Sequence, residues 1–332
     1  MNNQNFTFID FCSGIGAGRL GLEMLGLKCL AHSEINNDSD DTYKKFFADN
    51  NNLGDLTNLS YDKIPFSDIL IAGFPCQTFS IVGKRTGFED ERGQIIYYLS
   101  NILKNKKIPY FIFENVKGLV NHNKGNTLKS IITLLNSSGY EVFYKVLNSI
   151  DYGVPQLRER IYFVGIRADL CNKSFEFPEK QKHVNLKDFL LPNNNMVFDI
   201  ENLTFKKYLK NKYNYGKFDI EEILKNEYCV IDTRQSDLRI YENKCPTLRT
   251  GRHGLLYIMN GNLYKLQGLE ALLLQGFSKE YVLKAMNINN NMLLSQAGNA
   301  MTVNVINAIG RCLLRYIEDM EYEFSSKRFA NC

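Results

Sequence analysis

The feature that most constrains the fold of this chain is an alternation of short apolar runs with helix-length segments, from residue 6 to about residue 166. The runs with the length and composition of strands are Phe6 to Phe11, Lys28 to His32, Ile69 to Ala72, Tyr110 to Phe113, Glu141 to Leu147 and Ile161 to Ile166. Strands that alternate with helices predict an α/β fold with a mostly parallel sheet and helices on both faces. Ligands of such sheets bind outside the carboxyl ends of the strands.

Two of these runs end abruptly in residues that can do chemistry. The run Ile69 to Ala72 is followed by Gly73-Phe74-Pro75-Cys76-Gln77, which places a thiol at the exit of a buried strand. A lone cysteine is as often a small core residue. The run from Tyr110 ends in Glu114-Asn115-Val116, and a Glu that ends a buried strand has few purely structural explanations. Together, Cys76 and Glu114 predict an active site at this edge of the sheet.

Length and composition narrow the class of protein. A chain of 332 residues can form one large α/β domain and a smaller one. No segment reaches the roughly 20 apolar residues of a membrane span, and the polar start Met1 to Asn5 lacks the regions of a signal peptide. The eight cysteines are scattered, without metal-site spacing. We expect a cytoplasmic protein with reduced thiols and no structural zinc.

The net charge of +4 is too small to establish a nucleic-acid partner, but its location is informative. Residues 181–290 hold 16 Lys or Arg against 12 Asp or Glu, an excess that equals the whole net charge. Phosphate binding depends on local clustering of positive charge, so this is a weak indication of a nucleic-acid surface in that region. The region also departs from the α/β alternation. Its short runs Cys229 to Ile231 and Leu255 to Met259 predict strands of a smaller, mostly β domain.

A glycine-rich turn near the start predicts a nucleotide-like ligand. Phe8 to Gly18 reads as a strand and a glycine-rich turn that leads into a helix-like stretch, Arg19 to Leu25. Glu34, after the next strand, could hold ribose hydroxyls, and Asp55 could accept a bond from an adenine amino group. A dinucleotide and S-adenosylmethionine both remain open, although the Gly-x-Gly-x-Gly spacing is a poor match to the dinucleotide pattern.

Taken together, these segments resemble the C5-cytosine DNA methyltransferases. In chain order, the motifs that carry the resemblance are the cofactor loop Phe11 to Gly18, the nucleophile motif Gly73 to Gln77, the glutamate motif Glu114-Asn115-Val116, the paired-arginine motif Gln156 to Arg160, the motif Pro246 to Gly251 that closes the recognition domain, and the last motif Gln296 to Ala300. They follow the family's order across nearly the whole chain. The resemblance implies a Rossmann-like S-adenosylmethionine-dependent methyltransferase domain, 1–180 plus 291–332, and a target-recognition domain, 181–290.

The resemblance also implies the catalytic residues. The thiolate of Cys76 attacks C6 of cytosine, while Glu114, bonded at N3, stabilises the charge that develops in the ring. C5 then takes the methyl group of S-adenosylmethionine, and loss of its proton expels the thiolate. Arg160, with Arg158, contacts O2 of the base and the reacting centre. Asn115 orients the loop or the exocyclic amine of the base.

The cofactor is implied in the same way, as S-adenosylmethionine with S-adenosylhomocysteine as product and no metal. The implied cofactor-binding residues are Phe11, Ser13, Gly14, Gly16, Ala17, Gly18, Glu34, Ile35, Asp55, Leu56, Pro75, Ile95, Asn299 and Ala300. Two of them depart from the family pattern. Ala17 replaces a glycine, and Ile35 stands where an aromatic often stacks on adenine, so we expect an apolar contact there.

The substrate that the resemblance implies is double-stranded DNA, from which the target cytosine must be flipped out. The segment from Gln77 to Gly93 is the candidate lid over the base. The implied DNA contacts are Gln77, Ser80, Lys84, Arg85, Arg234, Arg239, Thr250 and Arg252. A restriction endonuclease that recognises the same sequence, without direct contact, is the implied partner. We expect a monomer with no membrane association.

Structural alternatives stand beside two of these assignments. Arg158 and Arg160 could instead form salt bridges with Glu159 or Asp151. Gly54-Asp55 could be an ordinary turn.

Three rival functions are weaker. A tRNA cytosine-5 methyltransferase would share the catalytic motifs, but the Cys-Phe-Thr signature of that branch is absent. A non-catalytic nucleic-acid-binding homologue is disfavoured because Cys76, Glu114 and Arg160 are all present. A dehydrogenase is disfavoured by the glycine spacing, and because the thiol and the Glu have no role in hydride transfer.

Overall fold

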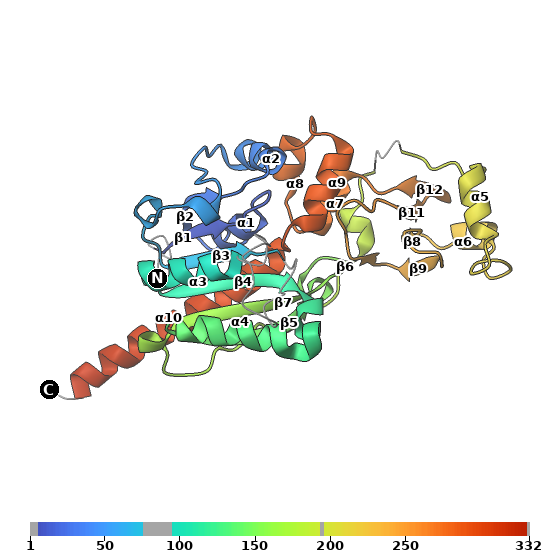
Figure 1. Cartoon of the computed structure of the whole chain (residues 1–332). Coiled ribbons are helices and arrows are strands. Elements are labelled where there is room, and N and C mark those ends of the chain that lie inside the picture. Colours follow the sequence, from blue (N-terminus) through green and yellow to red (C-terminus); the bar gives the residue numbers. More distant parts are fainter. Residues whose placement is uncertain (1–5, 76–94, 193–195, 331–332) are drawn as a thin grey trace. The chain divides into compact units, whose positions relative to one another are not determined.

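The computed structural model describes residues 6–75, 95–192 and 196–330, and the chain divides into two compact units (Figure 1). The first comprises Met1–Leu147, Glu159–Lys180 and Met301–Cys332, and the second comprises Asn148–Arg158 and Gln181–Ala300. The domain ranges expected from the sequence, 1–180 with 291–332 and 181–290, stay a prediction.

A six-stranded sheet in the order β2-β1-β3-β4-β7-β5 organises the first unit. Its strands are β1 (Thr7–Phe11), β2 (Lys28–Ser33), β3 (Ile69–Gly73), β4 (Tyr110–Val116), β5 (Tyr140–Asn148) and β7 (Glu159–Arg167). β1 pairs in parallel with β2 and β3, β3 pairs in parallel with β4, and β7 is antiparallel to β4. The strands coincide with the apolar runs of the sequence, which confirms the expected α/β fold.

Helices cover both faces of this sheet (Figure 1). They are α1 (Ala17–Glu23), α2 (Asn37–Phe47), α3 (Ile95–Lys106), α4 (Asn126–Ser137) and α10 (Val303–Ala330). Successive side chains of a strand point to opposite faces. On one face Ile9, Leu70 and Phe113 pack with Leu99 of α3 and Ile131 of α4 in a single buried cluster.

On the opposite face, glycines let the helices pack closely. A Cβ on Gly18 of α1 would stand 3.0 Å from Cδ1 of Ile71 in β3. A Cβ on Gly21 would stand 2.8 Å from the side chain of Ile306 in α10. The N-terminal helix and the C-terminal helix therefore lie against each other, so both ends of the chain help to build this unit.

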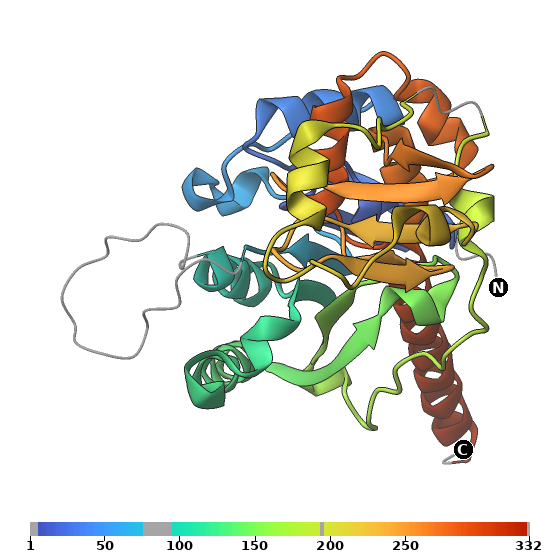
Figure 2. The ribbon, with the colours of Figure 1, turned by 90° about the vertical axis from the view of Figure 1, so that its right-hand side faces the viewer.

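The second unit contains an antiparallel sheet of order β12-β11-β8-β9 (Figure 2). Its strands are β8 (Cys229–Asp232), β9 (Arg239–Glu242), β11 (Leu255–Met259) and β12 (Asn262–Lys265), and β6 (Gln156–Leu157) pairs in parallel with β10 (Cys245–Pro246). Its helices are α5 (Leu203–Leu209), α6 (Ile220–Leu224), α7 (Gly268–Leu274), α8 (Lys279–Lys284) and α9 (Asn290–Asn299). Ile231, Ile258 and Leu263 of the sheet form its core with Phe205 and Ile223.

Short 3-10 turns complete the two units, at Leu56–Asn58, Tyr61–Lys63, Lys117–Val120, His122–Gly125, Ser149–Tyr152, Ala168–Leu170 and Leu186–Phe189. In the part of the chain that the structure describes, no helix has the length and apolar character needed to cross a membrane.

The apolar, helix-like segment from Asn299 to Tyr316 is not one continuous helix. α9 ends at Asn299, Ala300 is extended with φ −63° and ψ 146°, and α10 begins at Val303. The apolar pattern runs through the break because residues on both sides are buried, so hydrophobic periodicity alone could not locate it.

Candidate active site

The loop after β1 has a backbone that few residues tolerate. Cys12, Gly14 and Gly16 have φ values of 51°, 55° and 83°, in the left-handed region that favours glycine. A Cβ on Gly16 would stand 2.2 Å from the ring of Phe47, so α2 packs directly on this turn. Apart from its chain neighbours, no atom of the described residues lies within 4 Å of the position of a Cβ on Gly14, so the described part of the loop presents open backbone there.

Glu34, at the end of β2, is held toward this loop. Its carboxylate accepts hydrogen bonds from the backbone N–H of Gly14 at 2.8 Å and of Asn36 at 2.8 Å. The expected ribose-binding carboxylate is therefore fixed by the loop that would hold the rest of the ligand. A carboxylate has about four acceptor positions, so two backbone bonds leave capacity for hydroxyl donors.

Asn52 links the backbone of Glu34 to the backbone of Gly54, the residue before Asp55. The sequence did not indicate this role. The Oδ1 of Asn52 accepts the backbone N–H of Glu34 at 3.1 Å and of Gly54 at 2.8 Å, and its Nδ2 donates to the carbonyl of Glu34 at 3.0 Å. The hydroxyl of Ser33 adds a bond to the carbonyl of Gly54 at 2.6 Å. Asn52 stands in a polar run of asparagines, and no pattern in that run singles it out.

Asp55 caps the 3-10 turn Leu56–Asn58. Its Oδ1 accepts the backbone N–H of Thr57 at 2.9 Å and the Thr57 hydroxyl at 2.8 Å, and its Oδ2 accepts from Asn58 at 2.9 Å. The turn alternative for this position is therefore realised, and it also fixes the carboxylate in one orientation.

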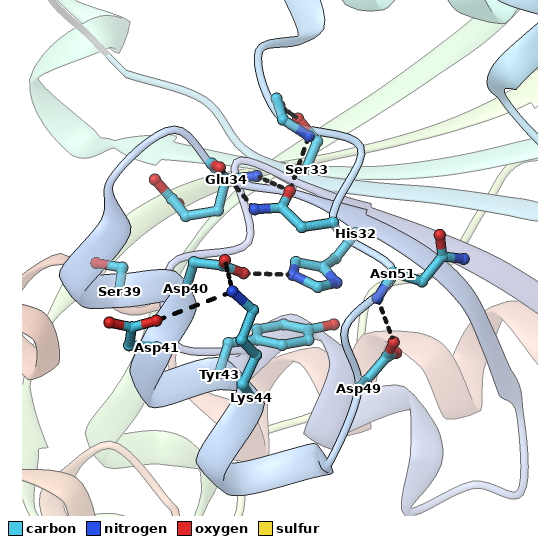
Figure 3. Close-up of polar contacts among 12 residues, drawn as sticks. His32, Ser33, Glu34, Ser39, Asp40, Asp41, Tyr43, Lys44, Asp49 and Asn51 are labelled. Atoms are coloured by element: carbon cyan, nitrogen blue, oxygen red, sulfur yellow. Dashed lines mark hydrogen bonds and ion pairs between the residues drawn. The ribbon is translucent and has the colours of Figure 1, made fainter.

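A buried layer supports β2 and α2 at this end of the sheet (Figure 3). His32 is fully buried, its Nε2 lies 2.9 Å from Oδ1 of Asp40, and its ring stacks on Tyr43 with centroids 3.8 Å apart. Lys44 lies 2.6 Å from the other oxygen of Asp40. Burial lowers the pKa of His32 even though the Asp40 carboxylate opposes this, so the imidazole stays neutral near pH 7.

The residues expected to bind the cofactor differ in how far their side chains are exposed. Phe11, Ala17 and Leu56 are buried in the core, so they can offer only backbone atoms. Ser13 is 4% exposed, and its hydroxyl has no hydrogen-bond partner among the residues described. Ile35 is 74% exposed. A buried hydroxyl with no partner at a glycine turn fits a polar ligand bound against this loop.

The second cluster lies at the adjacent strand ends of β3 and β4. Gly73 and Glu114 stand opposite each other in the parallel register of these strands. Pro75, two residues beyond β3, is exposed, and Ile95 is the first residue of α3. Four of the predicted DNA contacts, Gln77, Ser80, Lys84 and Arg85, lie outside the described residues, as does Cys76.

Glu114 and Arg160 form a buried ion pair. β7 brings Arg160 beside β4, opposite Val116, and its Nε lies 3.1 Å from Oε1 of Glu114. The two side chains are only 9% and 13% exposed, so their charges are mostly removed from water. The salt bridge suggested as an alternative, to Glu159, is instead made by Lys117, at 2.8 Å.

Asn115 ties the glutamate strand to the segment that leads to Cys76. Its Nδ2 donates to the carbonyl of Phe74 at 3.0 Å, and its Oδ1 accepts the N–H of Val116 at 2.8 Å. The side chain is buried, with 1% exposure of the residue. Of the two roles considered for Asn115, the geometry favours that of orienting the loop.

Arg158 lies in the other compact unit from Arg160. The residue is 2% exposed, and its guanidinium donates to the carbonyls of Leu248, Gly298 and Ala300 at 3.3, 3.1 and 2.7 Å. The two arginines of one motif therefore have different surroundings. Arg160 faces a carboxylate at a strand end, whereas Arg158 is enclosed by backbone.

The expected DNA contacts of the second unit also differ in exposure. Arg234 is buried, and binds both oxygens of Asp232 at 2.8 and 2.7 Å and the carbonyl of Thr247 at 2.8 Å. This internal bonding argues against a DNA contact by Arg234. Arg239 is exposed and paired with Asp237 at 3.0 Å, and Thr250 and Arg252 are exposed.

Arg249, Arg252 and His253 line a small hollow in this unit, together with Arg234 and the side chains of Leu248, Leu255, Leu266 and Leu294. His253 lies 3.2 Å from the hydroxyl of Ser295. The exposed arginines at this hollow give the second unit a positively charged surface, which suits a phosphate-bearing ligand.

Comparison with known proteins points to one family. The model of a family described as C-5 cytosine-specific DNA methylase matches residues 6–315. Type II methyltransferase M.DsaV of Dactylococcopsis salina is 34% identical over 335 residues, covering 99% of this chain and 91% of that protein. M.HaeII of Haemophilus aegyptius is 36% identical over 317 residues, covering 94% and 93%.

Solved structures show the same fold. The S. pombe Dnmt2 methyltransferase has a TM-score of 0.70 at 16% identity and covers 94% of this chain and 99% of its own. A putative DNA modification methyltransferase encoded within an E. coli prophage has a TM-score of 0.68 at 21% identity and covers 95% and 100%. Identities this low establish the architecture only.

Proposed function

Because this chain belongs to the C-5 cytosine-specific DNA methylase family and is a DNA cytosine-5 methyltransferase, we propose that it methylates a flipped-out cytosine at the edge of the sheet where β3 and β4 end. The observation that carries this assignment is the buried pair of Glu114 and Arg160 at the end of β4. It is a carboxylate beside a guanidinium, next to the strand that leads to Cys76.

The methyl donor of this family is S-adenosylmethionine, which supplies an electrophilic methyl group when bound. The residues present fit it, since the loop after β1 offers open backbone at Gly14 and the hydroxyl of Ser13 is buried with no partner among the described residues. Glu34 would bind the ribose hydroxyls, and Asp55 the adenine amino group. The other cofactor residues implied by the resemblance stay proposals, including Ile35, which is exposed.

The base end would supply the nucleophile and stabilise charge. The thiolate of Cys76 forms a bond to C6 of cytosine, and the electron pair of the C5–C6 double bond moves into the ring. Glu114, hydrogen-bonded at N3, and Arg160, at O2, stabilise that charge. C5 would use this electron pair to take the methyl group that S-adenosylmethionine supplies, with S-adenosylhomocysteine as the leaving group. When the C5 proton is lost, the electron pair of the C5–H bond re-forms the C5–C6 double bond, and the C6–S bond breaks to release the thiolate. Asn115 holds the carbonyl of Phe74 and so orients the segment that carries the nucleophile.

The relatives named as type II methyltransferases support the further proposals about partners. The substrate is double-stranded DNA with a short specific sequence, read by the second unit through its exposed arginines. The protein works as a monomer in the cytoplasm, and a separate endonuclease recognises the same sequence.

The test is to express the full chain in a host that lacks cytosine methylation and to map 5-methylcytosine across its genome by conversion sequencing. The proposal predicts methylation confined to one short motif and abolished by Cys76→Ala. A protein that binds S-adenosylhomocysteine but leaves the DNA unmethylated would overturn it and direct attention to RNA.

A further inference from the structure

Three buried polar side chains form a cluster in the second unit that the proposed chemistry does not use. Gln156 and Gln275 are fully buried, and Arg158 is 2% exposed. Gln156 donates to Oε1 of Gln275 at 3.2 Å and to the carbonyl of Leu274 at 2.8 Å. Burial of a charged guanidinium and two amides is costly unless their hydrogen bonds are made.

The cluster bonds to the end of α9. The last carbonyls of a helix have no partner within the helix. Gln275 donates to the carbonyl of Ala297 at 2.5 Å, and Arg158 donates to those of Gly298 at 3.1 Å and Ala300 at 2.7 Å. The negative end of the helix dipole favours a cation at this place. Arg158 therefore satisfies the carbonyls at the point where the chain leaves the helix.

The C-terminal end of α9 is also closely packed against the neighbouring backbone. A Cβ on Gly298 would stand 2.5 Å from the backbone nitrogen of Thr250, so α9 lies directly on the backbone of residues 249–250. Arg158 donates to the carbonyl of Leu248 at 3.3 Å as well. One guanidinium thus links the end of α9 to the neighbouring segment and holds the carbonyl of Ala300, the residue at which the backbone leaves the helix.

We propose that Arg158 is a positioning residue for the cofactor segment Asn299–Ala300, and that it does not contact the cytosine. This inference rests on the proposed function, which assigns those two residues to S-adenosylmethionine. It divides the paired-arginine motif, since Arg160 acts at the base and Arg158 sets the backbone of a cofactor segment.

The test measures binding of S-adenosylhomocysteine to the full chain by calorimetry without DNA, and separately kcat for DNA at saturating S-adenosylmethionine. Arg158→Lys keeps the charge but loses the planar fork. We expect its Kd to rise about tenfold, the equivalent of one lost charge-assisted hydrogen bond, with kcat little changed. Arg160→Lys, two residues away, should leave Kd unchanged and lower kcat.

Two further variants separate positioning from general destabilisation. Gln275→Leu removes the amide that holds Ala297, and should raise the Kd by a smaller factor. Ile231→Val weakens the core of the same unit without touching the cluster, and should lower the melting temperature but leave the Kd unchanged. A Kd of Arg158→Lys within twofold of wild type, or an equal rise in Ile231→Val, overturns the inference. A wild-type chain that binds the cofactor but does not methylate DNA contradicts the proposed function instead.

Discussion

The two units each contain a buried arginine–carboxylate pair, and the two pairs are built differently. In the first unit, Nε of Arg160 lies 3.1 Å from Oε1 of Glu114 at the end of a strand. In the second, Arg234 binds both oxygens of Asp232, and its remaining nitrogen donates to Thr247. The same two chemical groups can therefore serve a site or a scaffold, depending on where in the fold the pair lies.

The position of each pair supports this division. Glu114 forms the last parallel pair of β4 with β3, opposite Gly73 at the carboxyl end of β3, where ligands of α/β proteins bind. Asp232 ends β8, but the pair is enclosed, with side-chain exposures of 3% and 7%. Bidentate pairing consumes the directions in which Arg234 could have contacted a base.

The largest effect is expected when the enclosed pair is broken. Asp232→Asn leaves the guanidinium of Arg234 buried without its counter-charge, which typically costs about 3–5 kcal/mol of unfolding free energy. Urea denaturation measures this. Asp237→Asn is the matched control, because its pair with Arg239 is about half exposed and is worth at most about 1 kcal/mol. Equal losses in the two variants would remove the distinction between the enclosed pair and a surface pair.

Replacement of Arg160 in the Glu114–Arg160 pair should lower the rate of methylation. Arg160→Lys retains a positive charge but loses the planar donors, and we expect kcat to fall about 10²-fold, as for the loss of one charge-stabilising donor. Single-turnover methylation measures it. Lys117→Met is the control. It removes the exposed ion-pair partner of Glu159, the residue before Arg160 in β7, and should leave kcat unchanged. If Arg160→Lys methylates at the wild-type rate, Arg160 is not at the base.

The stabilisation by the Asp232–Arg234 pair should depend on pH. Burial alone would raise the pKa of Asp232, but hydrogen bonds from Arg234 outweigh it and hold the pKa below its ordinary value. A carboxyl whose pKa is lowered by folding stabilises the protein above its unfolded pKa, about 3.9. That stability is lost as the pH falls through the folded value. The stability difference between wild type and Asp232→Asn should therefore shrink below about pH 4, measured by denaturation at several pH values. A difference that stays constant with pH would contradict an ionised Asp232.

The smallest effect concerns the exposed arginines. Arg252→Gln should weaken DNA binding and reduce the slope of log K against log salt by about 0.9, the contribution of one phosphate contact. Fluorescence anisotropy at several salt concentrations measures it. Arg239→Gln is the comparison, since Arg239 is already paired with Asp237. An unchanged slope in Arg252→Gln would place that side chain away from the phosphates.

The strand-end residues could be predicted from the sequence because apolar runs end sharply there. That Gly73 and Glu114 lie close together could be predicted from the rule that parallel strands present their carboxyl ends at one edge of the sheet. The two arginines that flank Glu159 could not be separated, because their surroundings depend on segments more than 40 residues away. Arg158 donates a hydrogen bond to the carbonyl of Ala300, and Arg160 forms an ion pair with Glu114.

Other positions were beyond sequence reasoning for similar reasons. The pairing of Arg234 with a residue two positions earlier depends on the end of β8, and residue type alone suggested a DNA contact instead. Asn52 lies among other asparagines, and only the fold shows that its amide holds Glu34 and Gly54. Hydrogen bonds that depend on the path of the backbone in the fold leave no periodic trace in a sequence.

The most direct test of the account is to measure kcat and unfolding free energy together for Glu114→Gln and Asp232→Asn. We expect one variant to lose activity and the other to lose stability. Glu114→Gln should lose activity by about 10²-fold or more while remaining folded, and Asp232→Asn should lose stability while each folded molecule keeps its rate. A Glu114→Gln enzyme with wild-type kcat would contradict the assignment of the pair at the end of β4 to catalysis.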